Sequence, residues 1–135
     1  MTSPLQRGVS LIEALVAMAI ETMLVIAGHD AVGQADDLET ALAAVDADMP
    51  DLALVDMQLA RGCNGLDVAA ALKARGVPVM FATGNCPREN GRDVALGCLH
   101  KPFSYQTLAT AIAAAAAVLG GRSAPALPPS VHLYG

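Results

Sequence analysis

The sequence predicts an α/β fold, a doubly wound parallel sheet of five strands with helices on both faces. Two observations lead to this prediction. Short apolar runs alternate with helical patterns about five times along the 135 residues, and this repetition is typical of a parallel sheet covered by helices. The apolar runs are also nearly continuous, as in "DLALVDMQL" at residues 51–59, which indicates strands that are covered on both faces.

Composition sets limits on size and partners. A chain of 135 residues is one ordinary domain, long enough to bury most of its apolar surface. It is 54% hydrophobic but only 3% aromatic, so its core is built from Ala, Val, Leu, Ile and Met. The net charge is −5 without any run of Lys or Arg, which argues against nucleic acid or a membrane surface as a direct partner.

The first segment, "RGVSLIEALVAMAIETMLVIAG" at residues 7–28, has two interpretations. A basic residue and a glycine before an apolar run resemble the processing site of a type IV prepilin, which would make the protein a membrane-anchored filament subunit. In a soluble domain the same residues form a buried strand, 9–12, followed by a helix. Glu13 and Glu21 interrupt the run, which then falls short of the roughly 20 apolar residues of a membrane helix. We therefore expect the strand and helix, and keep the prepilin as a remote alternative.

The next elements follow in order. Residues 29–35 read as a short extended segment, and 36–49 as a helix with a capping Asp and with Leu38, Leu42 and Val45 at helical spacing. Pro50 ends that helix, and the apolar run that follows reaches a single acid, Asp56.

The second half continues the alternation. Residues 66–75 are predicted to be a helix and 77–84 a buried strand, while 85–93, "NCPRENGRD", hold at most a turn or two of helix. A fifth strand lies within 94–103. A closing helix covers 104–119 with Ser104 as its N-cap. The Gly- and Pro-rich residues 120–135 read as a flexible tail, so the domain is expected to span residues 1–119.

The cysteines and histidines suggest neither a disulfide framework nor a zinc site. Cys63, Cys86 and Cys98 are odd in number and lack CxxC spacing. They are expected to be reduced thiols in a cytoplasmic protein. The three histidines lie far apart in sequence, and surface or structural roles are expected for them.

Three polar residues follow consecutive strands of the predicted sheet. Asp56 ends the third strand, Thr83 the fourth and Lys101 the fifth, and a parallel sheet brings these ends to one edge. An aspartate can attack phosphorus and form an aspartyl phosphate, while a lysine neutralises phosphoryl charge and a hydroxyl donates to a phosphoryl oxygen. Each residue alone has an ordinary structural explanation. Their joint placement predicts a phosphoryl site.

The stretches "DLALVDMQL", "FATG" and "HKPF" resemble the receiver domains of two-component response regulators, over about residues 9–119. The resemblance implies a flavodoxin-like (βα)5 fold and a phosphoryl group accepted from a histidine kinase. It implies that Asp56 is the acceptor and that Thr83 and Lys101 bind the phosphoryl group and relay its presence. The run "PVMFATGN" looks like an FATG-type subgroup common beside bacterial kinases of the general stress or HWE type.

One part of the receiver pattern is missing. Receivers carry two adjacent acids after the first strand that hold magnesium, and the corresponding residues here are Leu11 and Ile12, with Glu13 one position late. Asp56 and the backbone carbonyl of Gln58 remain as expected ligands. If the missing acids reduce the net binding free energy of magnesium by about 1.4 to 3 kcal/mol, the ion binds about 10- to 100-fold more weakly. Magnesium is therefore expected to bind weakly or not at all, with aliphatic side chains in its place.

The resulting hypothesis is a cytoplasmic single-domain response regulator in a phosphorelay, with no output domain. Its expected partner is a histidine kinase or phosphotransfer protein, and a homodimer is possible. A pseudo-receiver that signals by binding alone is the main alternative. A phosphatase with an aspartyl nucleophile is a weak one, because Gln58 stands where such enzymes place a second acid. A turnover enzyme is not expected.

Two structural predictions complete this interpretation. Receivers usually hold the Lys-Pro peptide cis, so Lys101-Pro102 is predicted to be cis with the ammonium directed at Asp56. Residues 85–93 have almost no apolar anchors, and are predicted to be the most mobile part of the domain and a place where partners bind.

Overall fold

The computed structural model describes residues 9–12, 31–57 and 64–134 of the chain. These residues form one six-stranded sheet in the order β2-β1-β3-β4-β5-β6. Its strands are β1 (Val9–Ile12), β2 (Ala31–Gln34), β3 (Leu52–Val55), β4 (Val79–Thr83), β5 (Gly97–His100) and β6 (Val131–Leu133). The described helices are α2 (Leu38–Ala47), α3 (Gly65–Ala74), α4 (Glu89–Arg92) and α5 (Tyr105–Leu119).

The first five strands run parallel, as predicted. Each neighbouring pair among them is parallel, and their order, 2-1-3-4-5, is one of the two common orders of doubly wound sheets. The doubly wound fold class is confirmed. Strand β1 has the bounds that the sequence predicted, and the helix expected after it lies outside the described residues.

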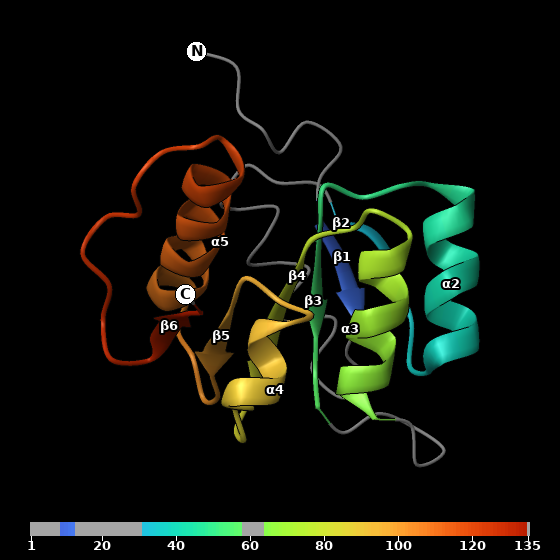
Figure 1. The fold of residues 1–135 in the computed structure, drawn as a ribbon, viewed down its shortest axis with the longest axis horizontal. Coiled ribbons are helices and arrows are strands. Elements are labelled where there is room, and N and C mark those ends of the chain that lie inside the picture. Colours follow the sequence, from blue (N-terminus) through green and yellow to red (C-terminus); the bar gives the residue numbers. More distant parts are fainter. Residues whose placement is uncertain (1–8, 13–30, 58–63, 135) are drawn as a thin grey trace.

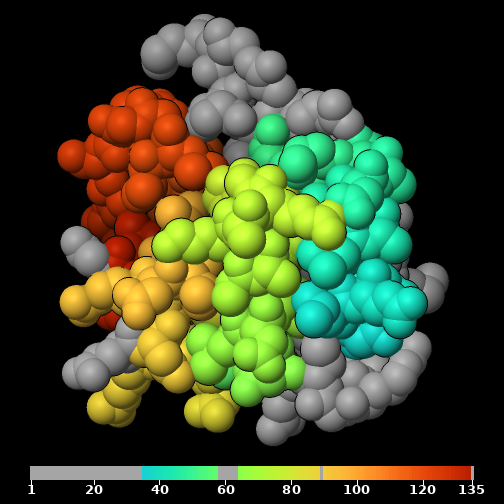
Figure 2. Space-filling view, turned by 45° about the vertical axis from the view of Figure 1, so that its right-hand side comes forward, coloured from blue at the N-terminus to red at the C-terminus, as the bar shows by residue number. Residues whose placement is uncertain are grey.

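Two apolar layers cover the two faces of the sheet. Leu52 and Leu54 of β3 pack with α5, whereas Ala53 and Val55 of the same strand pack with α2 and α3. This alternation follows from the two-residue period of a strand. Figure 1 shows α5 on one side of the sheet and α2 with α3 on the other. In Figure 2, α3 lies between α2 and the segment that contains α4.

Side-chain caps define where the two best-predicted helices begin. Asp37 accepts a hydrogen bond from the backbone N–H of Thr40 at 2.9 Å, and the Thr40 side chain completes a capping box at the start of α2. Ser104 and Thr107 form the same arrangement at the start of α5. These caps satisfy backbone groups that a helix end otherwise leaves unpaired. Both predicted N-terminal caps are confirmed.

The expectation of a flexible tail is wrong for part of residues 120–135. Strand β6 lies antiparallel to β5, with Leu99 opposite Val131 and Cys98 opposite His132. Without β6, β5 would be an edge strand with unpaired backbone groups. Val131 is also buried in the α5-side core. The Gly- and Pro-rich composition of the segment concealed this three-residue strand.

The expectation of three reduced thiols is wrong as well. Cys86, in the loop after β4, forms a disulfide with Cys98 of β5, with their Cα atoms 6.0 Å apart. Sequence spacing gave no sign of it, because the two residues meet only through the pairing of β4 with β5. Cys98 is completely buried, so the disulfide ties an exposed loop to the core.

Residues 85–93 contain only the four-residue helix α4, as predicted. The segment is nevertheless anchored, by the disulfide and by the Tyr134 hydroxyl, which donates to the Pro87 carbonyl. These anchors are a covalent bond and a hydrogen bond, and the lack of apolar anchors in the sequence gave no sign of either. Its mobility relative to the rest of the domain stays a prediction. Within the described ranges, no helix has the length and hydropathy to cross a membrane.

Candidate functional site

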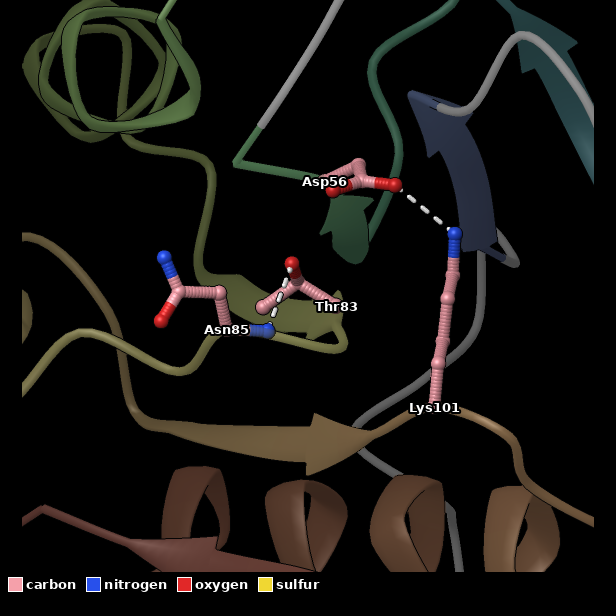
Figure 3. Close-up of polar contacts among 4 residues, drawn as sticks. All are labelled: Asp56, Thr83, Asn85 and Lys101. Carbon is pink, nitrogen blue, oxygen red and sulfur yellow. Dashed lines mark hydrogen bonds and ion pairs between the residues drawn. The ribbon is translucent and has the colours of Figure 1, made fainter.

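The three predicted site residues lie at the same edge of the sheet. Asp56 directly follows β3, Thr83 is the last residue of β4, and Lys101 directly follows β5. These three strands are parallel neighbours in the sheet. Figure 3 shows Lys101 extending from the end of β5 toward Asp56, with Thr83 between the two strand ends.

An ion pair joins the two charged residues. The Lys101 ammonium donates to Oδ2 of Asp56 at 2.7 Å. The Asp56 side chain is 14% exposed and that of Lys101 is 24% exposed. The pair is therefore partly shielded from solvent, where charges interact more strongly than at an open surface. The Lys101-Pro102 peptide is cis, so both parts of that prediction are confirmed.

Thr83 is positioned by its own turn. The residue is only 3% exposed. Its hydroxyl accepts a hydrogen bond from the backbone N–H of Asn85 at 3.2 Å, and its carbonyl accepts from the N–H of Lys101 at 3.0 Å. The Asn85 carboxamide points away from Asp56 (Figure 3). Asn85 thus contributes through its backbone, which residue type alone could not reveal.

Gly65 was missed by the sequence analysis, which began the predicted helix at residue 66. It is the first residue of α3, and its N–H donates to the Met57 carbonyl at 2.9 Å. A Cβ at this position would collide with the Asp56 carbonyl oxygen. Only glycine therefore lets α3 begin so close to the backbone that carries Asp56. The sequence signal was Asn64, whose side chain caps α3.

The described residues offer little to a magnesium ion. Leu11 and Ile12 of β1 lie opposite Leu54 and Val55 of β3, so two aliphatic residues stand at the end of the strand next to Asp56. Glu13 and Gln58 lie outside the described residues. The part of the chain that the structure describes contains no cluster of three His, Cys, Asp or Glu side chains that could hold a metal. Magnesium prefers several oxygen ligands, and Asp56 is the one carboxylate that we assign to this edge.

The geometry at this edge suits attack on a phosphoryl group. A carboxylate supplies the nucleophile, the neighbouring ammonium can neutralise charge, and the buried hydroxyl can donate to an oxygen. All three side chains are held by adjacent parallel strands, which fixes them relative to one another.

The sequence as a whole resembles known proteins. The sequence model of the response regulator receiver domain matches residues 13–113. The chain belongs to this family. Receiver domains are regulatory modules of two-component signalling.

Individual relatives agree with the family assignment. "Transcriptional regulatory protein PdtaR" of Mycobacterium tuberculosis is 33% identical over 105 residues, which cover 74% of this chain and 51% of PdtaR. "Phyllosphere-induced regulator PhyR" of Methylorubrum extorquens is 41% identical over 73 residues, 53% of this chain and 27% of PhyR. The solution structure of SdrG from Sphingomonas melonis Fr1 superposes with a TM-score of 0.66 at 35% identity, covering 84% of this chain and 98% of SdrG. The chain thus spans about half of PdtaR and about a quarter of PhyR.

Proposed function

We propose that this receiver accepts a phosphoryl group on Asp56 as one step of a phosphorelay. The observation that carries the proposal is the placement of Asp56, Thr83 and Lys101 on three adjacent strand ends, with the ammonium 2.7 Å from the carboxylate. Each of these residues alone has an ordinary structural explanation. A nucleophile, a cation and a hydroxyl donor at one edge form the set that phosphoryl transfer requires.

The proposed reaction moves one phosphoryl group. A carboxylate oxygen of Asp56 forms a bond to phosphorus while the bond from phosphorus to a donor histidine nitrogen breaks, and the nitrogen keeps that electron pair. Lys101 then pairs with the phosphoryl oxygens as well as with the carboxylate. The Thr83 hydroxyl donates to one of these oxygens. Because Thr83 and Lys101 are linked through their backbones, a change at one is transmitted to the other.

Magnesium would normally neutralise phosphoryl charge in such a site. In this chain Asp56 would hold it, with the Gln58 carbonyl as a second proposed ligand. Two aliphatic residues, Leu11 and Ile12, occupy the register positions next to β3. We therefore propose that magnesium binds weakly and that Lys101 neutralises much of the charge.

A binding-only pseudo-receiver is the second proposal. The observation that favours it is the ion pair, because the Lys101 ammonium already neutralises the Asp56 carboxylate. In that case the protein would present its surface to a partner in one state only. The remote prepilin alternative has no comparable support, because Val9–Ile12 is a strand of the sheet.

The proposed partners are a histidine kinase or a phosphotransfer protein, and a second copy of the chain is possible. The proposed compartment is the cytoplasm. Disulfides of cytosolic proteins are usually transient or redox-active, so Cys86–Cys98 would there be exposed to thiol reductants.

The test is direct labelling. The protein is incubated with acetyl phosphate or a phosphorylated histidine kinase over a series of magnesium concentrations, and intact mass is measured. We expect a gain of one phosphoryl group, localised to Asp56 and absent from Asp56→Asn. The matched control is Asp51→Asn, since Asp51 precedes the opposite end of the same strand. A folded protein that is never labelled would refute phosphoryl transfer. Kinase binding retained by Asp56→Asn would then support the binding-only function.

A further inference from the structure

A hollow of about 390 Å³ lies at a corner of the molecule, and Asp56, Thr83 and Lys101 do not line it. Its walls come from three segments: the loop after β4 with α4, the end of β5, and β6 with the residue after it. Figure 1 shows these segments gathered at one corner. The side chains that matter here are those of Arg88, Arg92, His100, His132 and Tyr134.

The charge of this hollow opposes that of the whole protein. The chain has 8 Lys and Arg and 3 His against 13 Asp and Glu. Two of those arginines and two of those histidines line this hollow, and none of its described lining residues is acidic. Neither Arg88 nor Arg92 forms an ion pair with a described carboxylate. The corner is therefore a local concentration of donors and positive charge.

The walls are held in place by several independent contacts. The disulfide fixes Cys86 against β5, and the Tyr134 hydroxyl donates to the Pro87 carbonyl. The Tyr134 N–H donates to the Leu96 carbonyl at 2.9 Å, which continues the pairing of β6 with β5. A side chain at Gly91 would collide with the Tyr134 ring. A hollow framed in this way exists before any ligand arrives, so little ordering opposes binding.

Ring contacts and strand pairing also fix the two histidines and the tyrosine of the hollow. The rings of His132 and Tyr134 meet edge to face, with centroids 5.4 Å apart and planes at 81°. The backbone N–H of His100 donates to the Ser130 carbonyl at 2.8 Å, which fixes the end of β5 beside the chain that leads into β6. Both histidines are thus carried on paired strands rather than on a loop.

We propose that this hollow is a binding site for a compact anion with at least two negative charges, carried either by phosphate groups or by two carboxylates. Two guanidinium groups match two negative charges, and each can donate two parallel hydrogen bonds to a phosphate or carboxylate. Imidazole N–H groups add further donors. The volume falls within the range of small-molecule sites, about 300 to 1,000 Å³, which favours a small ligand over an extended chain.

The test is a titration of the full chain, with its disulfide intact and without magnesium, by pyrophosphate and separately by succinate. Backbone amide NMR shifts and calorimetry report where and how tightly each anion binds. We expect saturable binding of at least one anion, with the largest shifts at residues 86–92, 100 and 132–134. The two arms distinguish a phosphate ligand from a carboxylate ligand.

Two charge-matched variants make the test specific. Arg88→Gln with Arg92→Gln is expected to weaken binding at least about tenfold, because charge-assisted hydrogen bonds are lost. Arg75→Gln with Arg122→Gln removes the same charge from residues that do not line the hollow, and is expected to change binding less than about twofold.

Three results would overturn the proposal. Equal weakening by both variants would show non-specific attraction to the surface. Shifts centred on Asp56 would place the anion at the phosphoryl site. A Glu-rich peptide that saturates the hollow while both small anions fail to saturate at about 10 mM would identify a protein partner instead. None of these results depends on whether Asp56 is phosphorylated.

Discussion

The Asp56 edge and the corner formed by α4, β5 and β6 are built by different means. At the Asp56 edge, side chains from three parallel strand ends meet through an ion pair and backbone hydrogen bonds. At the corner, a disulfide, an antiparallel strand and a tyrosine hydroxyl join segments that are distant in sequence. The first region depends on the regular βα repeat. The second depends on contacts added to that repeat.

Strand β5 takes part in both regions. Cys98 forms the disulfide, His100 lines the hollow, and Lys101 pairs with Asp56. A change in the corner can therefore reach the phosphoryl site through two adjacent residues. The two regions are thus separate in construction but share one strand, and substitutions confined to one region should leave the other largely unchanged.

The largest expected effect is on stability, from opening the disulfide. The disulfide closes a short loop, because Cys86 and Cys98 are separated by 12 residues in sequence. Opening such a loop is expected to lower the free energy of unfolding by about 3 kcal/mol. We expect dithiothreitol to lower the urea midpoint accordingly, measured by circular dichroism. Labelling of Asp56 should change little, because no residue of the phosphoryl site is removed.

A double variant provides the control for the disulfide. Cys86→Ser with Cys98→Ser should show the lower stability without reductant and should not respond to dithiothreitol. A wild-type midpoint that is the same with and without reductant would contradict a stabilising disulfide. A large drop in Asp56 labelling on reduction would show instead that the corner controls the phosphoryl site.

The next effect concerns only the Asp56 edge. Leu11→Asp with Ile12→Asp would return two carboxylates to the strand next to β3. We expect magnesium to bind about 10- to 100-fold more tightly, equivalent to about 1.4 to 3 kcal/mol, and labelling to become faster. Magnesium titrations and initial labelling rates measure both. Micromolar magnesium binding by the unmodified protein, or fast labelling unchanged by the substitutions, would mean that Glu13 or another group supplies the missing ligand.

One glycine in each region lies where a side chain would collide with a backbone carbonyl. A Cβ at Gly65 would collide with the Asp56 carbonyl, and one at Gly97 with the His132 carbonyl. Gly65→Ala and Gly97→Ala should each lower the unfolding free energy by about 1 to 3 kcal/mol. Only Gly65→Ala should also slow Asp56 labelling, since it displaces the backbone of the acceptor.

Gly84→Ala is the control for both substitutions, because the space around Gly84 is open. It should change stability by less than about 0.5 kcal/mol. Equal slowing of labelling by Gly65→Ala and Gly97→Ala would show that the two regions do not act separately.

The difference between the regions also explains what the sequence could predict. Strand β1, the capped helices α2 and α5 and the edge with Asp56, Thr83 and Lys101 follow from hydrophobic periodicity, capping residues and the geometry of parallel strands. Each of these signals is local. The order of the strand ends then brings the polar residues together without any knowledge of long-range contacts.

The corner could not be predicted in this way. The partner of Cys86 is fixed only once β4 and β5 pair, and β6 is a three-residue strand after a Pro-rich stretch. Gly65 was missed for a similar reason, because its close approach to Asp56 appears only when α3 is placed against β3. Contacts of this kind depend on the three-dimensional arrangement and leave little trace in local sequence.

The smallest expected effect isolates one hydroxyl of the corner. Burial raises the pKa of Tyr134 above its ordinary value of 10.0. As pH rises above 10, the phenol of the unfolded chain loses its proton before that of the folded chain. The stability that the neutral phenol provides is therefore complete below pH 10 and is lost as pH rises through the raised pKa.

Tyr134→Phe removes this hydroxyl and its hydrogen bond to the Pro87 carbonyl. At pH 8 the variant should be less stable than wild type by about 1 kcal/mol, the usual contribution of one such bond. The difference should shrink above pH 10, because only the wild type still has a phenol to ionise, while other groups that titrate in this range act equally on both proteins. Urea unfolding between about pH 8 and pH 11 measures this difference.

Tyr105→Phe is the control, since Tyr105 is 39% exposed on α5, and should differ little from wild type at any pH. A Tyr134→Phe difference that stays constant to pH 11 would show that the hydroxyl is not buried in the folded protein and would weaken the case for a preformed hollow at this corner.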